Sequence, residues 1–205
     1  MIHPTRTNLL LLREKARSVE NSVGILKARR QALIREFLGT TVPFLASRDE
    51  VRGEYAQALA ELHVSMGHEG EDGVGSLAAV TGRELEVEIA ERSVMGLRYR
   101  DVAPAESPIR SPGERGYDYR TTTPHLEEAI FRFETIVAAM LEIAAYESRL
   151  KRLRNEIVRV TRRIRVLEER VLPSLGHDIR VIGQYIGERE REAHYRLKRF
   201  KGLRG

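Results

Sequence analysis

The segment LKRLRNEIVRVTRRIRVLEERV, residues 150–171, sets the architecture of the whole chain. Its apolar side chains recur at alternating steps of three and four residues, which is the heptad seam of a coiled coil. The seam residues are Leu150, Leu153, Ile157, Val160, Ile164, Leu167 and Val171. Pro173 interrupts this seam, which resumes at Leu175 and continues to Ile186. A helix this long cannot bury its seam alone, so the rest of the chain must supply a partner.

A second seam near the N-terminus is the predicted partner. It comprises Leu9, Leu12, Ala16, Val19, Val23, Leu26, Arg30, Leu33 and Phe37. Only Arg30 is not apolar, and two interpretations stay open for it. Its head pairs with Glu168 or Glu169 on the opposite helix, or its stem lies on the seam while its head reaches water. Gly39 and Pro43 are predicted to weaken or bend the helix that follows.

The middle of the chain predicts a loop followed by a β-hairpin. Residues 67–76 hold four glycines, which predicts a flexible loop. Two alternating patterns follow, Leu85, Val87 and Ile89 with Glu84, Glu86 and Glu88, then Leu97 and Tyr99 with Arg98 and Arg100. With Met95 and Gly96 between them, they predict a hairpin whose first strand is half buried. Its arginines are expected to lie near its glutamates.

The start of the last helix is marked by a capping signal. Residues 103–120 are rich in proline and glycine and predict a loop. Thr123 and Pro124 then have the residue types of an N-cap and a first helical position. The first seam residues of this helix are predicted to be Leu126, Ile130, Phe133, Val137 and Met140. They are out of phase with the later seam, which predicts a coiled-coil discontinuity around Ala144.

Together these patterns predict a mainly α fold. The N- and C-terminal helices form a long two-stranded antiparallel coiled coil, with a small insertion that contains a β-hairpin. The predicted segments are an N-terminal helical arm at 5–65, a loop and hairpin insertion at 66–123, and a C-terminal helical arm at 124–202.

Composition excludes several classes of protein. The 205 residues include no Cys, which excludes structural disulfides and thiolate metal sites and favours a reducing cytoplasm. No apolar run approaches about 18 residues, and the start MIHPTR lacks an apolar signal core, so neither membrane insertion nor secretion is expected. Residues 149–204 carry a net charge of +10 and residues 47–102 a net charge of −6, which predicts different partners for the two regions.

No pattern in the chain indicates an active site. The glycine-rich loop lacks the Gly-Lys-Ser/Thr ending of a phosphate-binding loop, and no Ser lies in a nucleophile-elbow context. His63 and His68 near Asp72 lack a recognised metal-ligand spacing. We therefore expect no catalytic, cofactor-binding or metal-binding residues. The basic helices permit nucleic-acid binding, so the residues alone favour a scaffold coiled coil first and a basic nucleic-acid-binding adaptor second.

Four blocks of sequence carry a resemblance to a known family. They are PTRTNLL at 4–10, LKARRQALIREF at 26–37, TRRIRVLE at 161–168 with Pro173, and ERERE at 188–192 with RLKRFK at 196–201. In this order they resemble the D subunit of the V-type and archaeal A-type rotary ATPases. The segment Ser93-Val94-Met95-Gly96 is similar to the hairpin of that family. The gamma subunit of F-type ATPases is the alternative within the same architecture.

The resemblance implies a non-catalytic rotor shaft in the central stalk, without cofactors. Such a shaft couples ATP hydrolysis or ATP synthesis in the ring of catalytic A and B subunits to ion translocation, such as hydrogen ion transport. Its expected partners are the A and B subunits, the F subunit of the stalk and the membrane-side funnel subunit, on the cytoplasmic inner face of the membrane without direct insertion. Nucleic acid is not an expected partner.

The same resemblance implies which end of the shaft enters the ring. We expect it to be the basic terminal end, while the acidic insertion meets the other stalk components. The candidate partner contacts are Arg162, Arg163, Arg191, Arg196, Lys198, Arg199, Lys201, Met95 and Gly96.

Overall fold

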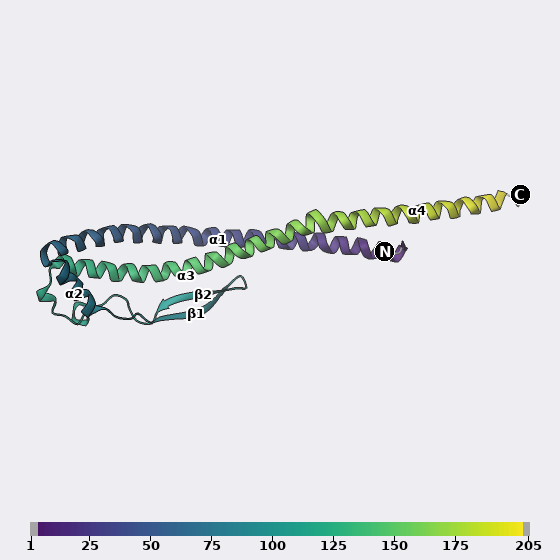
Figure 1. The fold of residues 1–205 in the computed structure, drawn as a ribbon. Helices are drawn as coiled ribbons and strands as arrows, with labels where there is room; N and C mark the ends of the chain where they lie inside the picture. Colours follow the sequence, from purple (N-terminus) through teal and green to yellow (C-terminus); the bar gives the residue numbers. More distant parts are fainter. Residues whose placement is uncertain (1–3, 203–205) are drawn as a thin grey trace. The chain divides into compact units, whose positions relative to one another are not determined.

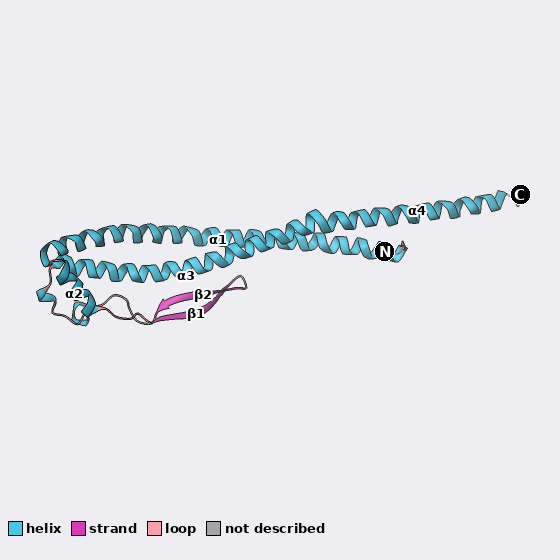
Figure 2. Ribbon diagram, viewed as in Figure 1, coloured by secondary structure: helices cyan, strands magenta, loops and turns pink. Residues whose placement is uncertain are grey.

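The computed structural model describes residues 4–202, and Figures 1 and 2 show its elements. They are α1 (Arg6–Glu69), α2 (Glu71–Thr81), β1 (Val87–Val94), β2 (Leu97–Pro104), the 3₁₀ turns η1 (Pro112–Glu114) and η2 (Tyr119–Thr121), α3 (Pro124–Val166), the π-helical segment η3 (Leu167–Val171) and α4 (Leu172–Gly202). The predicted mainly α fold with a small hairpin is confirmed. Residues 1–3, part of the start for which we expect no signal core, lie outside the described residues.

The chain forms two compact units. One contains the residues up to Leu33 and those from Glu156 onward, and the other spans Ile34–Asn155. The division into segments at 5–65, 66–123 and 124–202 stays a prediction.

Ion pairs between helices show antiparallel pairing within each unit. In the first unit Arg6 pairs with Glu190, Lys27 with Glu168 and Arg29 with Glu156; in the second Glu36 pairs with Arg149, Glu54 with Arg132 and Glu61 with His125. In each unit the partner's number falls as the residue number on α1 rises. The predicted antiparallel coiled coil is therefore confirmed by contacts along its length.

Both predicted seams are turned inward. Every residue of the N-terminal seam and of the seam from Leu150 to Ile186 is buried or half buried, and Leu33 and Leu153 are fully buried. Because neighbouring turns expose their other faces to water, the free energy of pairing comes mainly from this apolar stripe.

Arg30 is half buried on the seam, and of its two open interpretations the ion pair with Glu168 or Glu169 is not observed. Glu168 lies 2.6 Å from the Nζ of Lys27, and Glu169 lies 3.8 Å from the Nε of Arg165. No ion pair between residues 4 and 202 joins Arg30 to either glutamate. The structure therefore agrees with the other interpretation, in which the apolar stem lies on the seam.

The predicted flexible loop at 67–76 is wrong for nearly all of its residues. Gly70, at φ +78°, ends α1, and its N–H donates to the carbonyl of Met66 at 3.0 Å. The chain becomes helical again at Glu71 and forms α2, which buries Val74. Burial of this apolar side chain offsets the low helix propensity of the remaining glycines.

The predicted seam at the start of α3 is wrong in part. Val137 is 42% exposed and Met140 is 57% exposed, whereas Ala129 and Ile136 are buried. Apolar residues occupy two faces of this helix, so periodicity alone did not identify the inner one. Ala129 has a small side chain, which allows a facing helix to approach closely. This favours burial of the face of α3 that contains Ala129 and Ile136. The N-cap prediction is confirmed, since the hydroxyl of Thr123 accepts from the N–H of Leu126 at 3.3 Å.

The hairpin is confirmed, with two of its details corrected. Met95 and Gly96 form its turn with φ values of 50° and 79°, the conformation of a type I′ turn, which suits the strand twist. The first strand is exposed along nearly its whole length rather than half buried. The register sets Arg98 opposite Ser93 and Arg100 opposite Glu91, away from Glu84, Glu86 and Glu88.

Pro173 perturbs the last helix without ending it. A proline lacks the N–H that would bond to the carbonyl four residues earlier, and its ring crowds that turn. The π-helical turn η3 ends two residues before Pro173 and absorbs this misfit. The seam residues Leu167 and Val171 stay half buried within η3, so the pairing continues into α4.

Candidate partner-binding surfaces

The terminal surface on α4, residues 191–201, is the most exposed part of the helical pair. Every residue from Arg191 to Lys201 is exposed, including all five candidate basic contacts in this segment, and Arg162 and Arg163 are exposed as well. Tyr195, Leu197 and Phe200 are each more than 60% exposed. The segment therefore offers cations and apolar side chains together to a neighbouring protein.

A groove lies at the base of this terminal surface. It has a volume of about 720 Å³, and its lining includes Pro4, Arg6, Ile186, Arg189, Arg196 and Leu197. The Nε of Arg6 donates to Glu190 at 3.1 Å and Arg196 pairs with Glu192 at 3.5 Å, so two of the three lining arginines are neutralised. Arg189 keeps the groove weakly basic, which suits an acidic side chain of a partner.

A second surface, the mid-helix stripe, was not predicted from the sequence. It consists of Ile34, Leu38, Val42 and Leu45 on α1, which are 38%, 57%, 71% and 48% exposed. Their steps of four, four and three place them on one helix face, away from the buried Leu33. This spacing could have been identified in the sequence, but the more regular heptad seam of the same helix was interpreted instead. Contiguous exposed aliphatic side chains are typical of a protein interface.

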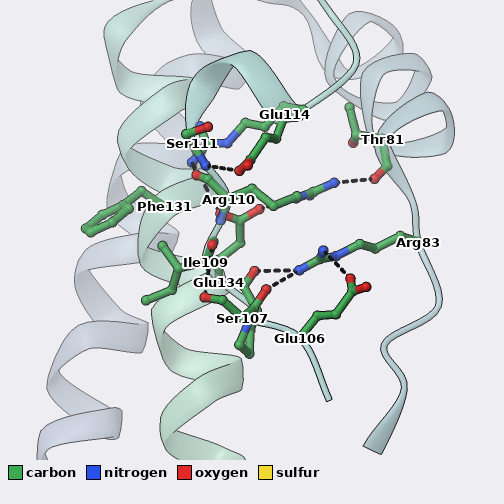
Figure 3. A network of polar contacts seen from close by, with 12 residues as sticks. Thr81, Arg83, Glu106, Ser107, Ile109, Arg110, Ser111, Glu114, Phe131 and Glu134 are labelled. Carbon is green, nitrogen blue, oxygen red and sulfur yellow. Dashed lines mark hydrogen bonds and ion pairs between the residues drawn. The ribbon is translucent and has the colours of Figure 1, made fainter. Parts of the chain in front are cut away.

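A polar network fixes the insertion against α3, as Figure 3 shows. The guanidinium of Arg110 donates to Glu134 at 2.7 Å and to the carbonyl of Thr81 at 3.1 Å. The guanidinium of Arg83 donates to the carbonyls of Ser107 at 2.7 Å and Pro108 at 3.0 Å. These bonds tie the end of α2 and the strand linkers to one helix.

Arg115 is the most deeply buried cation of this network, at 4% exposure. Its guanidinium donates to Glu127 at 2.5 Å and to Glu134 at 3.3 Å. The hydroxyl of Tyr117 donates to Glu127 at 2.6 Å, and burial together with this bond raises the pKa of Tyr117 to about 12. No sequence spacing predicted this cluster, because its members come from a loop and from a helix. Its pairing of buried cation with carboxylates indicates a structural role for the network.

The hairpin is held to α3 by Arg149. The guanidinium carbon lies 6.0 Å from the ring centroid of Tyr99, and Arg149 also pairs with Glu36 of α1. A cavity of about 310 Å³ lies beside this contact and is lined mainly by charged and aromatic side chains. At the tip, Met95 is 44% exposed and Gly96 is exposed, so both candidate contacts are accessible.

The described part of the chain holds neither a cluster of metal ligands nor a membrane-spanning helix. Residues 4–202 contain no group of three or more His, Cys, Asp or Glu side chains able to hold a metal ion. His68 stacks on His125 with ring centroids 6.4 Å apart, while His125 lies 2.6 Å from Glu61. No helix among these residues is long and apolar enough to cross a bilayer.

Comparison with known proteins adds a consistent finding. The family described as the D subunit of ATP synthase matches residues 8–202. The chain is 33% identical over 202 residues to the D subunit of the A-type ATP synthase of Thermococcus sibiricus, covering 98% of this chain and 94% of that protein. It is 32% identical to the proteins of that name from Pyrococcus furiosus and Methanopyrus kandleri, covering 98% of this chain and 94% and 86% of theirs.

Proposed function

Because this chain belongs to the family of ATP synthase D subunits, we propose that it is the central-stalk rotor shaft of a V/A-type ATPase or ATP synthase. The shaft couples ATP hydrolysis or synthesis in the A and B subunits to ion translocation. The observation that carries this function is a family match over residues 8–202, which includes both members of the antiparallel helical pair.

The pairing suits torque transmission. Buried seams and interhelical ion pairs resist separation of the helices, and two different helices present a different surface at each angle. Each angular position of the shaft therefore makes different contacts with the surrounding catalytic pairs. Those contacts shift the populations of their open and closed states, which is how a protein without a catalytic residue controls ATP chemistry.

The terminal surface is the part that enters the A and B ring. Its exposed cations, at Arg191, Arg196, Lys198, Arg199 and Lys201, suit a bore lined with carboxylates. Each exposed pair contributes at most about 1 kcal/mol, so no single arginine is indispensable. Arg162 and Arg163 add to this interaction from the adjoining helix.

The remaining partners bind the insertion-side half. The F subunit of the stalk binds there, where the mid-helix stripe offers exposed aliphatic side chains. The membrane-side funnel subunit meets the insertion, which the polar network holds in one conformation, and Met95 and Gly96 contact a partner from the hairpin tip. The chain is thus a peripheral component at the cytoplasmic inner face of the membrane, and it binds neither nucleic acid nor a cofactor.

Truncation tests this function. A chain that lacks residues 188–205 should still bind the F subunit, yet assemble poorly with the ring or allow ATP hydrolysis without ion pumping. A control that ends after Gly202 keeps the whole of α4 and should behave as the full chain. Ring assembly, ATPase rate and ATP-driven ion transport are measured together, and normal values of all three for the longer truncation would contradict the orientation.

The family match does not favour a nucleic-acid-binding adaptor. A salt titration of DNA binding checks this alternative, because a dedicated binder shows tight and steeply salt-dependent affinity with a sequence preference. We expect only weak binding without a sequence preference from this basic chain.

A further inference from the structure

Strand β1 has an open edge whose polar groups can be assigned from the register. The sheet of the described chain has two strands, and Val94 and Leu97 flank the two-residue turn. In such a hairpin this flanking pair exchanges both backbone hydrogen bonds, and every second pair does the same. The N–H of Ala105 donates to the carbonyl of Glu86 at 3.0 Å, so residues 86 and 105 continue the same series of hydrogen-bonded pairs.

The assignment leaves alternate backbone groups of β1 pointing outward. They belong to the odd-numbered residues Val87, Ile89, Glu91 and Ser93, while the even-numbered residues bond to β2. Four consecutive outward sites along one strand are enough to receive a neighbouring strand. Nothing within residues 4–202 pairs with them as a third strand.

This edge has charged side chains as its only protection against pairing. Isolated edges are commonly blunted by a proline, a bulge, a covering element or charged side chains, which repel strands of like charge but attract strands of opposite charge. The stretch from Val87 to Val94 has no proline and no lysine, and its pairing with β2 is continuous, without a bulge. Ile89 is 63% exposed and Val87 is 41% exposed, whereas Tyr99 and Val102 of β2 are half buried.

The charges beside the edge select the kind of strand that fits. The carboxylates near it are exposed, and no ion pair of the described residues includes them; they are Glu84, Glu86, Glu88 and Glu91. The one cation of β1, Arg92, pairs with Asp101 of β2 at 2.6 Å. The edge therefore presents negative charge to an incoming strand. Opposite charges on paired strands are stabilising.

We propose that the outer edge of β1 receives a β-strand of another rotor component, and that this strand carries Lys or Arg beside apolar residues. The inference rests on the proposed function, because the strand must rotate with the shaft. A row of backbone hydrogen bonds to the static ring would have to break at every step of rotation. Strand addition supplies affinity through the backbone, while the alternating side chains supply specificity.

Hydrogen–deuterium exchange with single-residue resolution tests the inference. The full chain alone is compared with the intact complex purified with its other subunits. The outward amides of Ile89, Glu91 and Ser93 should exchange at least about tenfold more slowly in the complex, since each becomes hydrogen-bonded. The amides of Ala90 and Arg92 should be protected in both states, which verifies that the hairpin is folded.

A matched pair of variants isolates the backbone contribution. Glu91→Pro removes one outward N–H without removing a bond to β2, because proline is tolerated on an edge strand. Glu91→Ala removes the same carboxylate and keeps the N–H. The proline variant should lose the protection at Ile89 and Ser93, and the alanine variant should keep most of it.

Cross-linking identifies the neighbour and its charge. A zero-length carbodiimide joins carboxylates to lysines in contact, and we expect Glu88 or Glu91 to link to a rotor component. Links to the A or B subunits alone would overturn the proposal, as would unchanged exchange of β1 in a complex that assembles and pumps ions. The rotor-shaft function survives those results, whereas it falls if the unmodified chain does not assemble with the ring at all.

Discussion

Arg149 of α3 lies with its guanidinium carbon 6.0 Å from the ring centroid of Tyr99 on β2, and the same guanidinium pairs with Glu36 of α1. One side chain thus connects the hairpin to both long helices. A cation over an aromatic ring contributes about 0.5–1 kcal/mol at a partly exposed site. The attachment of the hairpin is therefore specific but weak.

Removing the aromatic ring should loosen the hairpin. Tyr99→Ala is expected to accelerate amide exchange of β2 by roughly two- to fivefold, the kinetic equivalent of the lost cation–π contact. The midpoint of thermal unfolding should change little, since the helical seams are untouched. Tyr99→Phe keeps the ring and should match the unmodified chain. Equal exchange in all three proteins would show that Arg149 does not hold the hairpin.

Removing the buried cation of the polar network should be far more damaging. Arg115→Met leaves Glu127 without its cation while Glu134 keeps Arg110, and breaking a buried pair in this way costs up to about 3–5 kcal/mol. Arg120→Met is the control, because Arg120 is an exposed arginine of the same loop. Urea denaturation measures both, and a loss below about 1 kcal/mol for Arg115→Met would refute a structural role for the network.

The ionisation of Tyr117 should make the insertion sensitive to alkali. Its folded pKa of about 12 lies above its ordinary value of 10.0, first because of burial and then because of the bond to Glu127. A raised folded pKa means that the contribution is complete below pH 10 and is lost as the pH rises toward 12. Unfolding followed from about pH 9 to 12 should show this loss, and Tyr117→Phe should show a smaller one.

Arg30 should be dispensable for pairing, since its seam position is otherwise apolar. Arg30→Leu is expected to be neutral or stabilising, because it adds apolar contact and breaks no observed ion pair. Arg30→Glu should destabilise by a few kcal/mol, because its shorter stem leaves a carboxylate near the seam. Thermal unfolding ranks the variants. A clear loss of stability in Arg30→Leu, together with coupling energy to Glu168 in a double-mutant cycle, would contradict this prediction and support an ion pair between the two residues.

The mid-helix stripe should be needed for binding rather than for folding. The double variant Leu38→Glu with Val42→Glu alters two side chains that are 57% and 71% exposed, so unfolding should be nearly unchanged. Affinity for the F subunit should fall at least about a hundredfold, as expected for charges placed in an apolar contact. Ile25→Glu changes another exposed aliphatic residue of α1, outside the stripe, and serves as the control. Equal affinities by calorimetry would move the binding site of the F subunit elsewhere.

Local sequence patterns were sufficient to predict the coiled coil, its antiparallel partner and the hairpin turn. Each depends on a local property: the heptad period places Leu150 to Val171 on one face, and Met95-Gly96 adopts a backbone that few residue pairs favour. The choice between the two apolar faces of α3 could not be made in this way. Burial of Ala129 and Ile136 depends on the facing helix, which no local pattern describes.

Tertiary packing likewise made α2 helical, because burial of Val74 outweighs the glycines, and it assembled the network around Arg115. The exposure of β1 is a third such case. An alternating strand pattern shows that one face is apolar, but it does not show whether anything in the same chain covers that face. For Val87 and Ile89 nothing among the described residues buries it. Tyr99, which contacts Arg149 of α3, is the register partner of Arg92, so Val87 and Ile89 lie on the opposite face of the hairpin.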